Sequence, residues 1–185
     1  VESNISPGAH FVSLNVSEAP TNELAVRKAI ALAVDRDAMI ESLLFGNAEK
    51  SRSGVNQASA FYTDEIPMIE YDPEAAAAIL DEAGWVMGDD GVRERDGEKL
   101  IVNLLSTDYT NWGLMNQVLQ EQLAAIGIAS EISSQEWNAY LDQWRENQGG
   151  WNVTYHSQGS IMARTEPIQA SWIPNDYWTI TQIDD

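Results

Sequence analysis

The sequence predicts an α/β domain built around a mixed sheet that is flanked by helices. The first observation behind this is a nearly continuous apolar run from Lys99 to Thr107, which is typical of a strand buried on both faces. The second is that an amphipathic segment, residues 111–127, separates this strand from another at Ile128 to Ser133. A strand, a helix and a strand at this spacing predict a βαβ unit with a right-handed crossover.

The amino-terminal part of the chain predicts a short strand followed by two helices. The strand covers His10 to Asn15. Thr21 or Asn22 is expected to cap the first helix, with Glu23 in its first turn, and Asp35 to cap the second. Gly46 then ends the pair. The residues expected to face the core are Leu24, Ala25, Val26, Ala29, Ile30, Ala33 and Val34 in the first helix and Ala38, Met39, Leu43 and Leu44 in the second.

The remaining elements follow in order. Residues 47–70 carry little periodic signal and predict a loop that wraps the domain. Asp72 and Pro73 begin a helix that Gly84 ends, and Trp85 beyond it is expected in the core. Asp-Gly pairs within 87–100 predict a hairpin. A helix over 135–147 carries Trp137, Tyr140, Leu141 and Trp144 on one stripe, and a strand over 149–157 closes the series.

The composition excludes several classes of protein. The formal net charge is −19, and the ten basic residues do not cluster, so nucleic acid is not an expected partner. The absence of cysteine removes disulfides and thiolate nucleophiles. No apolar run reaches the roughly 20 residues that span a bilayer. The length of 185 residues fits a single domain, and both ends look cut, so we expect a piece of a longer protein.

The residue pattern predicts neither catalysis nor a resident metal or cofactor. His10 and His156 are predicted to be ordinary polar residues of strands, because neither has another ligand at metal-binding spacing. Ser157 beside His156 is not a catalytic pair, since adjacent residues of a strand point to opposite faces. A hydrolase is therefore the least favoured class. The sequons at Asn15 and Asn152 lie on or next to predicted strands, where a glycan would disrupt pairing.

Two loops after predicted strands are candidate binding rims, because ligands bind outside the carboxyl ends of strands in open α/β sheets. The first rim consists of Thr107, Asp108, Tyr109, Asn111 and Trp112. The second is "SQGSIM", which includes Ser157, Gln158, Gly159 and Ser160. Its small polar residues and glycine can present backbone N–H and C=O groups to an extended ligand. A plain surface loop is the alternative at both places.

Six ordered segments together resemble one family, the dipeptide/oligopeptide/nickel class of ABC-transporter solute-binding proteins. The segments are "FVSLN", "PTNELAVRKAIALAVDRDAMIESLLFG", "YDPEAAAAILDEAGW", "DGEKLIVNLL", "LQEQLAAIGIASEI" and "EWNAYLD". The resemblance runs from about Phe11 to Tyr155 and concerns the family's second lobe. "PTNELAVR" is especially similar to the nickel-binding branch.

The resemblance implies a bilobed, periplasmic or membrane-anchored extracellular binding protein that is not an enzyme. Such a protein captures a peptide or peptide-like solute and delivers it to an ABC permease in the membrane, and its two lobes close by a hinge. The present chain, residues 1–185, would form most of the carboxy-terminal lobe, and the first lobe of the same protein would be missing from it. A binder of a nickel chelate with the same fold is the alternative.

The family's site residues carry over in part. In peptide binders the motif resembled by "EWNAYLD" places a Trp near the ligand, which points to Trp137. The loop after the next strand usually contains a Trp and then an Asp, and both are missing from "YHSQGSIMARTEP", where Glu166 matches only the distal end of the pattern. His156 is similar to a strand-end His of the nickel branch. The expected binding face is Trp137 with Ser157, Gln158, Gly159 and Ser160, with Tyr109 and Trp112 nearby, and with His156 in the nickel alternative.

Overall fold

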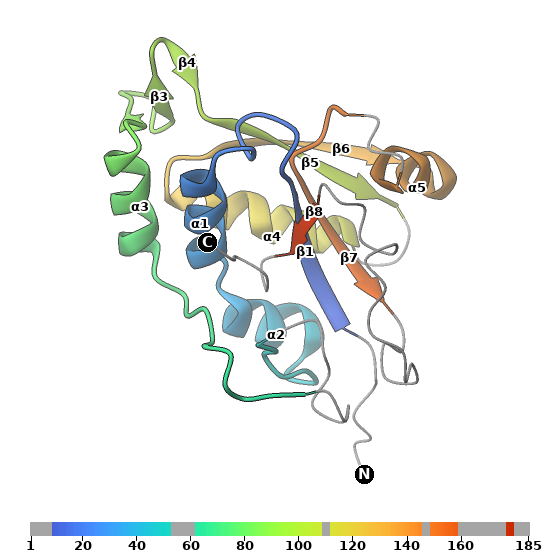
Figure 1. Cartoon of the computed structure of the whole chain (residues 1–185). Coiled ribbons are helices and arrows are strands. Elements are labelled where there is room, and N and C mark those ends of the chain that lie inside the picture. The colour runs from blue at the N-terminus through green and yellow to red at the C-terminus, as the bar shows by residue number, and fades with distance from the viewer. Residues whose placement is uncertain (1–8, 53–61, 109–111, 146–148, 159–176, 180–185) are drawn as a thin grey trace.

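The computed structural model describes residues 9–52, 62–108, 112–145, 149–158 and 177–179, with the backbone alone at residues 9, 156–158 and 177–179. Figure 1 shows helices packed around a central twisted sheet, with a small second sheet projecting beyond one end of it. The predicted mixed sheet flanked by helices is confirmed. Within this described part, no helix combines the length and the apolar character that crossing a bilayer requires.

The central sheet has the strand order β6-β5-β7-β1-β8. Its strands are β1 (Ala9–Asn15), β5 (Ile101–Thr107), β6 (Ala129–Gln135), β7 (Val153–Gln158) and β8 (Tyr177–Thr179). β5 runs parallel to both β6 and β7, whereas β1 runs antiparallel to β7 and β8. The amino end of β1 therefore lies beside the carboxyl end of β7 and at the same edge of the sheet as the carboxyl end of β5. The short strand β8 was not among the sequence predictions.

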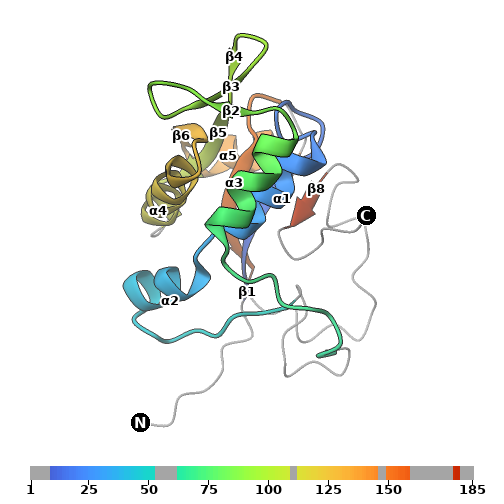
Figure 2. The same cartoon turned by 90° about the vertical axis from the view of Figure 1, so that its left-hand side faces the viewer.

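Within the described ranges, five helices accompany the strands. They are α1 (Leu24–Ala33), α2 (Arg36–Leu44), α3 (Pro73–Glu82), α4 (Trp112–Ala125) and α5 (Trp137–Arg145). Figure 2 shows α1 and α3 side by side in one layer. The predicted βαβ unit is confirmed, because α4 connects the parallel strands β5 and β6.

α4 and α5 cover opposite faces of the central sheet. On β7, Thr154 hydrogen-bonds Tyr140 of α5, whereas its neighbour Tyr155 contacts the ring of Trp112 on α4. Successive residues of a strand point to opposite faces, so the two helices lie on the two sides of β7. Their amino-terminal ends meet around the edge where the parallel strands end.

Two of the predicted helix caps are confirmed. The Asp35 carboxylate accepts a hydrogen bond from the backbone N–H of Ala38 at the start of α2, and Asp72 does the same for Ala75 at the start of α3. Gly46 and Gly84 follow their helices in the left-handed region, with φ of 71° and 84°.

The prediction that Thr21 or Asn22 caps the first helix is wrong. α1 begins at Leu24, and its N-cap residue, Glu23, makes no side-chain capping bond. Thr21 is fully buried, and its hydroxyl donates to the backbone carbonyl of Asn15 at 2.6 Å. It also accepts a hydrogen bond from the amide of Asn152 at 3.1 Å. Tertiary contacts thus occupy the hydroxyl that local sequence assigns to capping.

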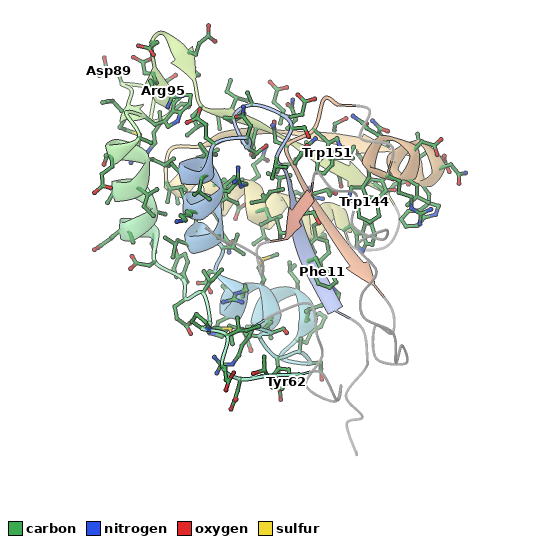
Figure 3. All side chains as sticks on the ribbon, viewed as in Figure 1. Phe11, Tyr62, Asp89, Arg95, Trp144 and Trp151 are labelled. Carbon is green, nitrogen blue, oxygen red and sulfur yellow. The ribbon has the colours of Figure 1, made fainter. Side chains whose placement is uncertain are left out.

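The region after α3 contains one strand more than the predicted hairpin. It forms the three-stranded antiparallel sheet β2-β3-β4, made of β2 (Val86–Met87), β3 (Arg93–Arg95) and β4 (Glu98–Lys99). Leu100 interrupts the predicted strand from Lys99, since its N–H donates to the carbonyl of Arg93, and β5 begins at Ile101. Figure 3 shows Asp89 and Arg95 at this small sheet, far from Trp144 on α5.

Arg93 joins the small sheet to the helix layer. Its side chain is 3% exposed and donates to the carbonyls of Ile126 at 2.8 Å and Trp85 at 2.6 Å. It also pairs with the carboxylate of Asp81 at 2.5 Å. A buried guanidinium with several acceptors is stable because its charge is compensated, and it fixes the ends of α3 and α4 against β3.

The core follows the predicted pattern with a few exceptions. Trp85 is 5% exposed and lies in the core as expected. Leu24 and Ala38 were expected on core faces, but Leu24 is 37% exposed and Ala38 is also exposed. The sequon residues Asn15 and Asn152 are 0% and 3% exposed and hydrogen-bonded, so this fold leaves no room for a glycan there.

Candidate functional site

The candidate site is the edge of the central sheet where β5, β6 and β7 end. In the described residues this edge carries the start of α4, the start of α5 and the last residues of β7. It also carries the start of β1, because β1 runs antiparallel to β7. In Figure 1 the arrowhead of β7 lies beside the start of β1. Ligands of open α/β sheets bind outside the carboxyl ends of strands, which makes this edge the first place to examine.

The structure brings two of the predicted site residues together. Trp112 is the first residue of α4 and Trp137 the first residue of α5. Their rings meet edge to face with centroids 5.5 Å apart. Trp112 is only 5% exposed, whereas Trp137 is half-buried. The Trp137 ring is therefore the more accessible of the two, and the buried Trp112 ring packs against it.

Three further aromatic side chains extend this pair into an aromatic array. The array consists of Trp112, Trp137, Tyr140, Trp144 and Tyr155. Tyr140 stacks on Trp137 at 5.7 Å and on Trp144 at 6.2 Å. Trp112 makes edge-on contacts with Tyr140 at 5.6 Å and Tyr155 at 6.3 Å. Such pairs add about 0.5–1.5 kcal/mol beyond burial, so the array is a rigid support.

Hydrogen bonds fix the array to the strands. The hydroxyl of Thr154 donates to the carbonyl of Leu105 at 2.8 Å, so it accepts the O–H of Tyr140 at 3.1 Å. Burial raises the pKa of Tyr140 to about 12, and it raises the pKa of Tyr155 as well. Both phenols therefore keep their protons at neutral pH and act as hydrogen-bond donors.

Asn116 holds the first turn of α4 against β5. Its amide group donates to the hydroxyl of Ser106 at 3.0 Å and to the carbonyl of Trp112 at 3.1 Å. Asn116 is fully buried, and its side-chain oxygen has no hydrogen-bond partner among the described residues. The bonds to Ser106 and to the Trp112 carbonyl thus hold the helical turn that carries the Trp112 indole against β5.

His10 is the polar member at the exposed end of the site. Its Nδ1 is hydrogen-bonded to the hydroxyl of Tyr155, and the two ring centroids lie 5.8 Å apart. Partial removal of the ring from water lowers the pKa of His10. The imidazole is consequently neutral at pH 7.

The other predicted site residues lie at the limits of the described structure. Tyr109, Gly159 and Ser160 lie outside the described residues, as do Asn111 and Glu166. His156, Ser157 and Gln158 belong to β7, where the backbone register pairs Ser157 with His10 and His156 with Phe11. Their roles in binding remain predictions. Among the described residues no group of three or more His, Asp or Glu side chains is placed to hold a metal ion.

Sequence reasoning missed His10, Tyr140 and Tyr155 as members of the site. Tyr140 was assigned to the apolar stripe of its helix, and Tyr155 stands two residues before the predicted second rim. A strand-end rule that included the last three residues of the predicted strand 149–157 would have found Tyr155. His10 gives no such signal, because only the antiparallel pairing of β1 with β7 brings it to this edge.

Comparison with known proteins identifies the family. Residues 2–177 match the model of the bacterial extracellular solute-binding proteins, family 5 middle region. The nickel-binding periplasmic protein of Escherichia coli K12 is 31% identical over 172 residues, which cover 88% of this chain and 32% of that protein.

Solved structures agree with this match. The oligopeptide-binding protein AppA of Bacillus subtilis in complex with a nonapeptide gives a TM-score of 0.81 at 26% identity, covering 90% of this chain and 33% of the other. The ABC transporter-associated periplasmic binding protein DppA of Helicobacter pylori in complex with the peptide STSA gives 0.73 at 26% identity, covering 86% and 29%. The chain thus spans about a third of these relatives. It belongs to the bacterial extracellular solute-binding proteins of family 5.

Proposed function

We propose that this chain is one lobe of the solute-binding component of an ABC importer, which captures a peptide or peptide-like solute outside the membrane and passes it to the permease. The observation that carries the proposal is the aromatic array at the carboxyl edge of a fold that matches AppA with its bound nonapeptide. Aromatic rings grip peptide side chains and backbone with little loss of conformational entropy. Trp137 would contact the solute, and Trp112 would hold the Trp137 ring in position.

The proposal places residues 1–185 in the carboxy-terminal lobe of a two-lobe, periplasmic or membrane-anchored protein. The chain's coverage of about a third of each relative supports a larger whole. The solute would lie between this lobe and the first one, and closure of the two lobes would bury it. The function is binding and transport, not catalysis.

A nickel chelate is the alternative solute. It is favoured by the nickel-binding periplasmic protein, which is 31% identical over 88% of this chain. In that case His156 would lie near the chelate, as its place at the end of β7 allows.

Calorimetry on the full-length protein separates the two solutes. One titration uses a pool of short synthetic peptides, and the other uses a preformed nickel–histidine complex. Saturable heat with peptides and none with the nickel complex is expected. Saturable nickel binding that disappears in His156→Ala would overturn the peptide proposal in favour of the chelate.

A further inference from the structure

The contact between His10 and Tyr155 allows the protons of both side chains to be assigned. Tyr155 is 4% exposed, and its hydroxyl reaches Nδ1 of His10. Among the described residues, this is the hydroxyl's one hydrogen-bond partner. His10 itself is exposed at the start of β1, next to the end of β7.

The buried hydroxyl decides which atom donates. If Nδ1 carried the proton, the oxygen of Tyr155 would accept it, and the phenolic proton would be left buried without an acceptor. A buried donor without an acceptor keeps the full cost of its removal from water. The favoured arrangement is therefore a phenol that donates to an unprotonated Nδ1, because this satisfies both groups with a single bond.

The tautomer of His10 follows from that bond. A neutral imidazole carries one proton, so with Nδ1 as acceptor the proton resides on Nε2. The exposed ring then directs its remaining polar group, an N–H donor, away from Tyr155. In the described part of the chain, no other hydrogen bond is made by this ring.

We propose that His10 is a recognition residue of the solute site, whose Nε2–H donates a hydrogen bond to an oxygen of the bound solute. The oxygen is a backbone carbonyl or a terminal carboxylate of a peptide. Metal coordination needs an unprotonated ring nitrogen, and here Nδ1 is taken by Tyr155 while Nε2 carries the proton. The inference rests on the proposed peptide function and assigns a role to a residue that sequence reasoning placed among ordinary strand residues.

Binding measurements on full-length variants test the role. His10→Phe keeps a ring against Tyr155 but removes both nitrogens, and it should weaken peptide binding roughly threefold to tenfold, the worth of one hydrogen bond. His10→Gln can accept from Tyr155 through its carbonyl and donate through its amide, so it should bind more tightly than His10→Phe. Tyr71→Phe removes a half-exposed phenol on the segment before α3 and serves as the control with unchanged affinity.

The probes are short synthetic peptides with a free carboxyl terminus and the same peptides amidated. A loss in His10→Phe for both forms identifies a backbone carbonyl as the acceptor, and a loss for the free acid alone identifies the carboxylate. Either result supports the inference. Equal affinity of His10→Phe and wild type for both peptide forms overturns it while leaving the peptide function intact. A wild-type protein that binds no peptide overturns the function itself and the inference with it.

Nitrogen-15 spectra of the imidazole supply a second measurement. It requires neither solute binding nor that the His10→Phe variant folds. The ligand-free wild-type protein should show His10 protonated on Nε2 at neutral pH. Tyr155→Phe, which keeps the ring contact with Trp112 but removes the donor, should shift His10 towards a mixture of tautomers. A wild-type ring protonated on Nδ1 overturns the inference.

Discussion

At the scale of single residues, Glu23 ties the start of α1 to the small sheet. Its carboxylate accepts two hydrogen bonds from Arg95, at 2.6 and 3.0 Å, and each side chain is 32% exposed. The guanidinium also lies over the ring of Trp85, 4.2 Å from its centroid. Hydrogen bonding to Arg95 lowers the pKa of the Glu23 carboxyl, with the charge of Arg95 acting in the same direction.

The lowered pKa makes a pH-dependent prediction for Glu23→Gln. A carboxyl whose pKa is lower in the folded state stabilises the fold above its unfolded pKa, and this contribution is lost as the pH falls through the folded pKa. At pH 7 the variant should be less stable by about 0.5 kcal/mol, as for a partly exposed ion pair. The difference should begin to shrink near roughly pH 4, where an unfolded glutamate takes up its proton, and it should vanish only below the lowered pKa of the folded state.

Urea unfolding of both proteins at neutral and acid pH measures this. Glu82→Gln, an exposed residue near the end of α3, is the matched control and should show little effect at either pH. A deficit of Glu23→Gln that persists unchanged in acid would mean that packing, not the ion pair, is responsible.

At the scale of elements, Gly127 governs how α4 turns into β6. It has a φ of 83°, and a Cβ there would lie 2.8 Å from both Cγ of Arg93 and Cε of Met87. The residue thus has two constraints, a left-handed backbone and close contact with the small sheet. Gly91, with a φ of 79°, has the first constraint alone, since no described residue other than its two chain neighbours places an atom within 4 Å of the position that a Cβ would take there.

Replacing these glycines by alanine should separate the two costs. Gly91→Ala should destabilise the protein by roughly 1 kcal/mol, the cost of a left-handed alanine. Gly127→Ala should cost about 1–3 kcal/mol more, because the methyl group overpacks against Arg93 and Met87. Thermal unfolding of the two variants checks the order. Equal costs would show that the backbone at Gly127 shifts freely.

The elements also show which features could be read from sequence. Asp35 and Asp72 were recognised as caps because a cap depends on a side chain and an N–H three residues away. Thr21 has the same local signature, but its hydroxyl hydrogen-bonds the Asn15 carbonyl and the Asn152 amide instead. Asn15 lies before the helix, and Asn152 is distant in the sequence. Local rules therefore succeed where no tertiary partner competes for the same group.

The candidate site likewise combines features that local sequence predicts with features that depend on tertiary contacts. Trp112 was predicted because it lies in the loop after a strand whose direction the βαβ pattern fixes, whereas Trp137 was predicted from the resemblance of "EWNAYLD" to the peptide binders. The pairing of β1 with β7 is antiparallel and joins distant segments, so no local pattern announces it. For that reason His10 could not be placed beside Tyr155 from the sequence.

At the scale of the whole molecule, the chain spans about a third of its relatives, and in the proposed two-lobe protein it would supply one wall of the solute site. We expect residues 1–185 alone to bind the peptide pool at least roughly tenfold more weakly than the full-length protein, because half of the contacts and the lobe closure are missing. Parallel calorimetric titrations of the two proteins test this. Equal affinity would contradict a solute held between two lobes.

The antiparallel pairing of β1 with β7 also affects the order in which the chain is expected to fold. The contact between His10 and Tyr155 joins residues 145 positions apart, whereas β5, α4 and β6 form one continuous stretch from 101 to 135. Closing the longer loop costs more chain entropy, and non-local pairings form slowly. We therefore expect the contact between His10 and Tyr155 to form after the βαβ unit, so that the nascent chain forms the strands and helix of that unit before the contact that orients His10.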